Sequence, residues 1–98
     1  MRRDETIEKL KTHAEELRSR GVTRLCLFGS VLRNESTPDS DIDLLVDLDP
    51  DQRMSLIDFA ELRLRLGDIL GHEVDLVRRD GLKPYLKDAI LAEARDVL

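Results

Sequence analysis

The sequence has almost none of the residues that build disulfide, zinc or aromatic sites. Its 98 residues include one cysteine, two histidines and no tryptophan, and aromatic residues make up 3% of the chain. Cys26 cannot form a disulfide within the chain, and two histidines are too few to complete a zinc cluster around it. Long hydrophobic runs are also absent, since none approaches the ~18 residues of a membrane-spanning helix. We therefore expect a reduced thiol, no membrane segment and, with no secretory signal at the N-terminus, a cytoplasmic protein.

Positive charge is scarce as well. Sixteen basic side chains stand against 21 acidic ones, which gives a formal net charge of −5 and a pI near 5.0. A surface that binds the phosphate backbone of DNA or RNA needs an excess of lysine and arginine, so we expect no direct contact with nucleic acid. Hydrophobic residues at 41% and charged residues at 38% are typical of a globular protein. A chain of this length has room for one core, so residues 1–98 are expected to form a single domain.

The spacing of apolar residues predicts alternating helices and strands. Helices are predicted over residues 4–20, 30–34, 55–70 and from 82 onward. Strands are predicted over residues 25–28, 41–49 and 72–77. The order of these elements indicates an α/β (α+β) fold, in which helices pack on a small mixed sheet of three or more strands.

The two long helices in the second half of the chain have recognisable ends and apolar faces. Ser55, with Asp58 three residues on, resembles a capping box, and Gly71 ends that helix. Its expected buried stripe consists of Leu56, Phe59, Leu62, Leu66 and Leu70. In the last helix, Pro84 lies in the first turn and Tyr85 is expected to pack. The other residues expected to face inward there are Leu86, Ala89, Ile90 and Val97.

Acidic residues gather in one segment. Residues 35–51 hold seven acidic side chains and no basic one. Asp41 and Asp43 are two apart in a predicted strand, so both carboxylates leave the same face. At about 4 Å and an effective dielectric constant near 20, two such charges repel by roughly 4 kcal/mol, and a divalent cation is the simplest compensation. The alternative is a solvated acidic loop followed by an edge strand.

A third carboxylate lies inside an apolar strand. Val74 and Leu76 flank Asp75, so Asp75 takes the opposite face from both. If this strand lies beside that of Asp41 and Asp43, three carboxylates meet on one patch. Such a set of oxygen donors suits a pair of Mg²⁺ ions that also bind triphosphate oxygens. The alternative is an ordinary outward-facing position without a ligand.

A glycine-serine pair stands where a buried strand meets the predicted short helix. Gly29 lets backbone amides approach an anion, and the Ser30 hydroxyl can donate a hydrogen bond to a phosphate oxygen. Arg33 follows within one helical turn and is placed to meet the same phosphates. Alone, a Gly-Ser pair is ordinary turn chemistry. Here, however, ten residues separate Ser30 from Asp41.

This combination resembles the signature of the DNA polymerase β-like nucleotidyltransferase superfamily. The run from Phe28 to Arg33 and the run from Ser40 to Val46 are similar to those of its minimal, single-domain branch, the MNT proteins. The resemblance spans nearly the whole chain and implies the polymerase β-like core fold. Many relatives have Ala-Arg-Gly where this chain has Leu32-Arg33-Asn34. Asn34 tolerates the backbone conformation that a glycine would take, so we expect the loop to survive.

The resemblance also implies roles for the residues of the motif. Asp41 and Asp43 would hold two Mg²⁺ ions, and Asp75 would complete the metal site and help to deprotonate an attacking hydroxyl. The residues that would bind the triphosphate of ATP are Gly29, Ser30 and Arg33.

The resemblance further implies a partner. MNT proteins are commonly antitoxins paired with a HEPN-domain toxin, a small helical RNase, and active members of the MntA type transfer AMP from ATP to a tyrosine hydroxyl of that toxin. We therefore expect an AMP-transferring antitoxin in a hetero-oligomer with its toxin. Two alternatives stay open. One is a non-catalytic antitoxin that covers its toxin stoichiometrically, and the other is a nucleotidyltransferase that acts on a small molecule such as an aminoglycoside.

Overall fold

A four-stranded mixed sheet forms the centre of the computed structural model, which describes residues 2–98. The strands are β1 (Val22–Phe28), β2 (Ile42–Leu48), β3 (Val74–Arg78) and β4 (Arg95–Asp96). Their order is β3-β2-β1-β4, in which β1 is antiparallel to β2 and to β4, and β2 is parallel to β3. The predicted mixed sheet of three or more strands is confirmed.

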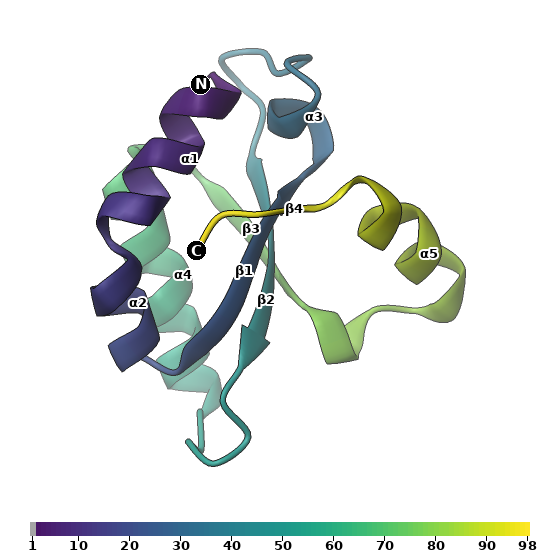
Figure 1. Cartoon of the computed structure of the whole chain (residues 1–98). Coiled ribbons are helices and arrows are strands. Elements are labelled where there is room, and N and C mark those ends of the chain that lie inside the picture. The colour runs from purple at the N-terminus through teal and green to yellow at the C-terminus, as the bar shows by residue number, and fades with distance from the viewer. Residues whose placement is uncertain (1) are drawn as a thin grey trace.

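Helices lie on both faces of this sheet (Figure 1). They are α1 (Arg3–Thr12), α2 (Ala14–Ser19), α3 (Gly29–Leu32), α4 (Leu56–Leu70) and α5 (Pro84–Glu93), with a 3₁₀ turn at Arg79–Gly81. None of these helices within residues 2–98 is long and apolar enough to cross a membrane. The predicted α+β class is confirmed.

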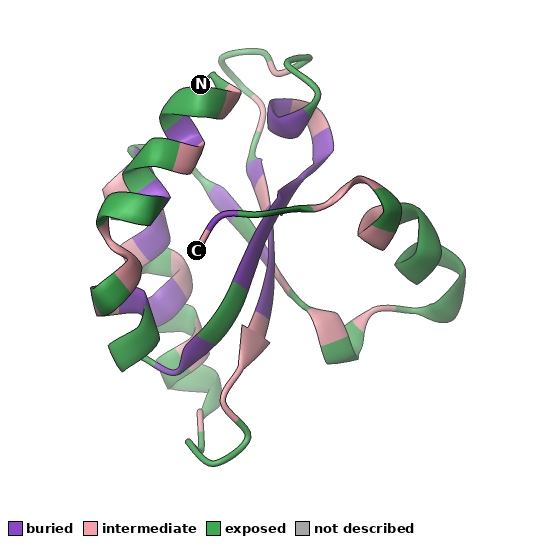
Figure 2. Ribbon diagram, in the orientation of Figure 1, coloured by how far each residue is buried: buried purple, intermediate pink, exposed green. Residues whose placement is uncertain are grey.

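One face of the sheet, covered by α1, α2 and α4, carries the main core (Figures 1 and 2). The strand residues buried in it include Leu25, Leu27, Ile42, Leu44 and Val46. Glu16 of α2 accepts two hydrogen bonds from Arg65 of α4, at 2.6 and 2.8 Å. The Arg65 guanidinium lowers the pKa of Glu16 to about 2. This ion pair joins two of the covering helices at the surface of the core.

The opposite face holds a smaller core beneath α5. Cys26, Phe28 and Leu45 are buried there. The side chains packed against them are Val77, Leu82, Ile90, Leu91 and Ala94. This face of β2 is not purely acidic, because Leu45 is 1% exposed and lies on it between Asp43 and Asp47. Most of α5 itself is exposed (Figure 2).

The predicted helix over residues 4–20 is two helices. His13 interrupts it with a non-helical backbone (φ −102°, ψ 16°) between the end of α1 and the start of α2. Its Nδ1 lies 2.9 Å from the carbonyl oxygen of Lys9. The apolar period continues across the break, which is why the sequence pattern alone indicates one helix.

The N-terminus of α4 has the predicted capping box. Ser55 Oγ accepts the backbone N–H of Asp58, and the Asp58 carboxylate accepts the N–H of Ser55, each at 3.1 Å. Gly71 ends the helix in the left-handed conformation (φ 69°), as expected. The expectation of a buried Leu56 is wrong, since that side chain is 90% exposed. Leu56 is the first residue of the helix, and the inward stripe begins one turn later with the partly buried Phe59.

Replacing the capping serine should measurably weaken the fold. We expect Ser55→Ala to lower the free energy of unfolding by about 1 kcal/mol, because the backbone N–H of Asp58 in the first turn loses its hydrogen-bond acceptor. The matched control is Ser19→Ala, whose hydroxyl donates to the Glu16 carbonyl oxygen within its own helix end and should change stability by less than about 0.5 kcal/mol. Urea denaturation measures both, and equal midpoints for the two variants would contradict the role of the cap.

The predicted last helix ends earlier than expected. α5 stops at Glu93, Ala94 is extended (φ −60°, ψ 138°), and β4 then pairs with Cys26 and Leu27 of β1. The buried Val97 therefore belongs to the chain after β4 rather than to a helix. Leu86 and Ala89, expected to face inward, are exposed, and so is Tyr85 at 73%. Only the end of α5 from Ile90 onward reaches the sheet, so the first turns of the helix extend into solvent.

Candidate functional site

Asp43 and Asp75 lie directly opposite each other on adjacent strands. The parallel register of β2 and β3 pairs Asp43 with Asp75, and Asp43 also faces Phe28 across the antiparallel pair β1–β2. Residues in register point to the same face of a sheet, which here is the face beneath α5. Val74 and Leu76 are buried on the other face. The predicted placement of Asp75, opposite in direction to its apolar neighbours, is confirmed.

The acidic groups at this end of the sheet repel one another. Burial raises the pKa of Asp43, the carboxylates of Asp75 and Asp41 raise it further, and the Arg33 guanidinium lowers it. Asp41 precedes the first residue of β2 and is exposed, as is Asp75. All three predicted carboxylates therefore act on one region. A half-buried carboxylate perturbed by two like charges is typical of a functional site.

The chain passes from β1 into α3 through a turn that requires glycine. Gly29 has φ +77°, and a Cβ atom at this position would overlap Oδ2 of Asp43. Glycine meets both conditions, because it adopts positive φ without strain and has no side chain. Ser30 follows within α3 and is partly exposed. Asn34 takes the left-handed conformation (φ 57°) just after α3, as the sequence predicts.

Arg33 is held by two carboxylates. Its Nε donates to Glu35 at 3.1 Å, and its Nη1 donates to both oxygens of Glu93 at 3.0 Å. Glu93 Oε1 also accepts the backbone N–H of Gly29 at 3.0 Å. Glu93 is the last residue of α5, so the C-terminal part of the chain contacts the glycine turn directly.

Sequence reasoning did not find Glu93. Its two partners lie 60 and 64 positions away in the chain. Its neighbours give no motif, and an acidic residue at the end of an exposed helix is usually solvated. Only the packing of α5 against β1 brings this carboxylate to Gly29 and Arg33.

The chemistry of the three aspartates fits Mg²⁺. Carboxylate oxygens are the ligands that Mg²⁺ prefers, and the repulsion that raises the pKa of Asp43 (burial first, then Asp75 and Asp41) is what a cation would relieve. Within residues 2–98, no three His, Cys, Asp or Glu side chains converge closely enough to hold a metal ion as they stand. The exposed side chains of Asp41 and Asp75 can change rotamer without opening the core.

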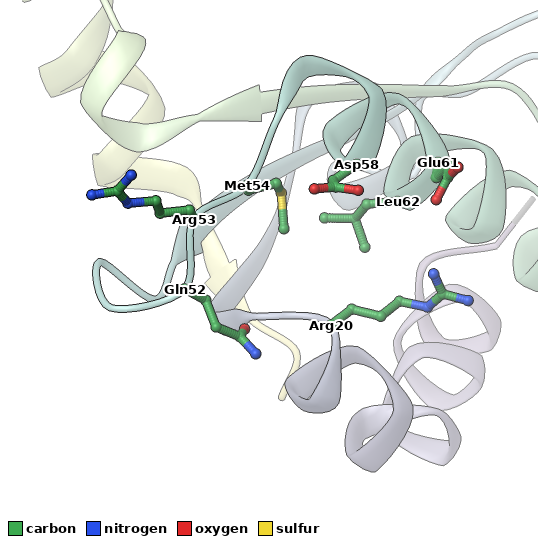
Figure 3. A pocket seen from close by; sticks show the side chains of 7 residues that line it. All are labelled: Arg20, Gln52, Arg53, Met54, Asp58, Glu61 and Leu62. Carbon is green, nitrogen blue, oxygen red and sulfur yellow. The ribbon is translucent and has the colours of Figure 1, made fainter.

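A separate hollow lies at the other end of the sheet (Figure 3). It has a volume of about 270 Å³ and lies between the end of α2 and the start of α4. Its lining residues are Arg20, Gln52, Arg53, Met54, Asp58, Glu61 and Leu62. β1 begins and β2 ends on this side, whereas Gly29 and Asp41 lie at the opposite ends of the same strands. The hollow is therefore not part of the carboxylate site.

The profile of the nucleotidyltransferase domain matches residues 7–97. This stretch contains all four strands, the glycine turn and the three aspartates. The chain belongs to the nucleotidyltransferase-domain family. This match confirms the resemblance seen in the sequence. The chain is a minimal nucleotidyltransferase domain.

Individual relatives agree with this assignment. The protein adenylyltransferase MntA of Thermococcus cleftensis is 43% identical over 91 residues, which cover 91% of this chain and 90% of the relative. A solved structure described as a minimal nucleotidyltransferase is 36% identical and superposes with a TM-score of 0.82, covering 97% of this chain and 95% of the other. A chain from the complex of tri-AMPylated Shewanella oneidensis HEPN toxin with MNT antitoxin shares the fold, with a TM-score of 0.67, 21% identity and coverage of 95% and 71%.

Proposed function

We propose that this chain is a Mg²⁺-dependent protein adenylyltransferase that transfers AMP from ATP to a tyrosine hydroxyl of a HEPN-domain toxin, and that it acts as the antitoxin. The observation that carries the proposal is the strand register that sets Asp43 opposite Asp75, with Asp41 two residues earlier and the Gly29 turn against the Asp43 carboxylate. Membership of the nucleotidyltransferase family supports nucleotidyl transfer. The name of the Thermococcus relative supports a protein as the acceptor.

Three aspartates carry the chemistry in this proposal. Asp41, Asp43 and Asp75 would hold two Mg²⁺ ions, which when bound neutralise triphosphate charge and make the α-phosphorus more electrophilic. Asp75 orients the acceptor hydroxyl and takes its proton as the oxygen attacks the α-phosphorus in line. The bond from the α-phosphorus to the oxygen that bridges to the β-phosphate breaks, and pyrophosphate leaves with the bonding electrons.

The glycine turn binds the leaving part of the nucleotide. Gly29 brings the backbone to the phosphates, the Ser30 hydroxyl donates a hydrogen bond, and Arg33 supplies positive charge to the β- and γ-phosphates. Their position beside Asp43 on the same end of the sheet supports this role. The donors would then hold the β- and γ-phosphates, while the aspartates would face the α-phosphate through the Mg²⁺ ions that they hold.

The acceptor in this proposal is a protein bound as a stable partner. The fold likeness to the complex of a tri-AMPylated HEPN toxin with an MNT antitoxin supports this class of partner. A tyrosine presented by the toxin would approach Asp75, and the pair would form a hetero-oligomer. We expect no direct contact with nucleic acid, because a net charge of −5 does not favour binding to a phosphate backbone.

The test is transfer of label from α-labelled ATP to a HEPN-domain toxin that copurifies with this chain. With Mg²⁺ we expect covalent label on the toxin, assigned to a tyrosine by peptide mass spectrometry, and none when EDTA is added. A toxin with phenylalanine in place of that tyrosine is the matched control and should stay unlabelled. Absence of label with the unmodified pair would refute the proposal.

Growth protection separates catalysis from simple binding. A chain with Asp41→Ala and Asp43→Ala changes the surface only at these two carboxylates, so an antitoxin that merely covers its toxin would still protect cells. We expect this variant to lose protection while it still copurifies with the toxin. Protection retained by the variant would assign neutralisation to stoichiometric binding instead.

A further inference from the structure

Glu93 occupies the two groups that the proposed function assigns to phosphate. Its Oε1 accepts the Gly29 N–H at 3.0 Å, and both of its oxygens accept Arg33 Nη1 at 3.0 Å. A backbone amide beside a guanidinium binds a phosphate oxygen as readily as a carboxylate oxygen, since both are anionic acceptors. An anion of the chain itself thus fills the donor pair.

Charge makes this occupancy exclusive. The hydrogen bonds from the Gly29 amide and from Arg33 hold the pKa of Glu93 below its usual range, so the side chain is ionised at neutral pH. Glu93 also adds to the negative field at Asp43. A triphosphate brings several further negative charges to the same donors. The Glu93 carboxylate and a phosphate bound to the same donors would lie side by side and repel each other, so a bound nucleotide must take the place of the carboxylate.

The turn of α5 that carries Glu93 packs on the sheet but is only partly buried. α5 contains no fully buried residue, and the β4 strand that follows it pairs with only two residues of β1, Cys26 and Leu27. The Glu93 side chain is 31% exposed. Beyond Glu93 the chain is anchored by the Arg24–Asp96 ion pair and by the buried Val97, so only the partly buried turn around Glu93 moves at low cost in free energy.

We propose, on the basis of the function proposed above, that Glu93 is an internal competitor for the phosphate-binding donors. It holds Gly29 and Arg33 before nucleotide arrives, ATP displaces it, and its release loosens the junction between α5 and β4. Glu93 is then a positioning residue that sets nucleotide affinity and links nucleotide binding to the C-terminal segment.

Nucleotide affinity tests this inference directly. Titration calorimetry with ATP and Mg²⁺ on the full chain compares the unmodified protein with Glu93→Gln, which keeps the shape of the side chain and removes its charge. We expect the Kd of Glu93→Gln to be about tenfold lower, because one charged hydrogen-bonded contact no longer has to be broken. The control is Glu35→Gln. Glu35 also pairs with Arg33, through Nε, but the amide of Gly29 is bonded to Glu93 instead, so its Kd should stay within about twofold.

Hydrogen exchange tests the same inference without a substitution. In the unmodified chain, saturating ATP with Mg²⁺ should speed amide exchange over residues 91–94, because the contact that Glu93 makes at the end of α5 is released. In Glu93→Gln, ATP should change that exchange much less. A merely structural role for Glu93 would leave the ATP dependence of exchange unaltered.

The outcomes separate this inference from the function on which it rests. Equal or weaker ATP binding by Glu93→Gln, or exchange over residues 91–94 that does not rise with ATP, shows that Glu93 is not a competitor and leaves the nucleotidyltransferase proposal intact. Failure of all three proteins to bind ATP overturns the nucleotide site itself. Circular dichroism confirms that each variant is folded.

Discussion

Asp43→Asn should reduce AMP transfer about 10³-fold or more while leaving the thermal stability of the chain no lower than before. The loss of activity follows from the proposed role, since an amide is a poor ligand for Mg²⁺ and carries no charge. The retained stability follows from the raised pKa of Asp43, which burial and the carboxylates of Asp75 and Asp41 cause. Folding disfavours the ionised carboxylate relative to the unfolded chain, so removing its charge removes an unfavourable interaction from the folded state.

Asp47→Asn provides a control from the same strand and the same face. The Asp47 carboxylate accepts two hydrogen bonds from Arg79 Nε, at 2.8 and 3.0 Å, outside the acidic site. We expect this variant to transfer AMP at a rate within about twofold of the unmodified chain and to lose about 1 kcal/mol of stability. Asp43→Asn should therefore lose activity and keep its stability, whereas Asp47→Asn, four residues away, should keep its activity and lose stability. A loss of stability in Asp43→Asn, or its continued activity, would contradict the assigned role.

Gly29→Ala should destabilise the chain by about 3 kcal/mol. A residue with a side chain is strained at φ +77° by about 1–2 kcal/mol, and its Cβ would overlap the Asp43 carboxylate, which adds a cost of about 1–3 kcal/mol. For a domain of this size the melting temperature should fall by more than about 10 °C. Activity should fall as well, because the added Cβ atom forces either the turn at position 29 or the Asp43 carboxylate to move.

Gly71→Ala separates the two causes. Gly71 has a similar φ of +69°, but nothing lies within 4 Å of a Cβ built on it, so this variant should lose only about 1 kcal/mol. The remainder measures the contact between position 29 and Asp43. In an Asp43→Ala background the carboxylate is gone, and Gly29→Ala should then cost about 1–2 kcal/mol less. Equal costs in both backgrounds would show that the two residues do not press on each other.

The local features of the fold were predictable because they depend on near neighbours in sequence. The capping box at Ser55 and the left-handed residues Asn34 and Gly71 follow from side-chain and backbone chemistry within one turn. The break at His13 was not predictable, because the apolar period continues through it. β4 was also missed, since Arg95–Asp96 has no strand pattern and pairs only because β1 offers an edge.

The candidate site divides in the same way. Alternation along β2 and β3 predicts which face each aspartate takes, and the register Asp43–Asp75 agrees with it. The burial of Leu45 on the same face does not follow from the alternation, because it depends on α5 packing over the sheet. Glu93 lies beyond sequence reasoning for the same reason. The carboxylate reaches Gly29 only through a helix that packs against the far side of the sheet from the main core.

The position of Asp75 bears on the size of substrate that this end of the sheet admits. β3 is an edge strand in the order β3-β2-β1-β4, so Asp75, the residue proposed to activate the hydroxyl, lies at the edge of the sheet. A tyrosine on the surface of a folded protein can approach an edge strand from the side. A residue on a central strand is flanked by strands on both sides and is harder for a large substrate to reach. This geometry suits modification of a whole protein without prior unfolding.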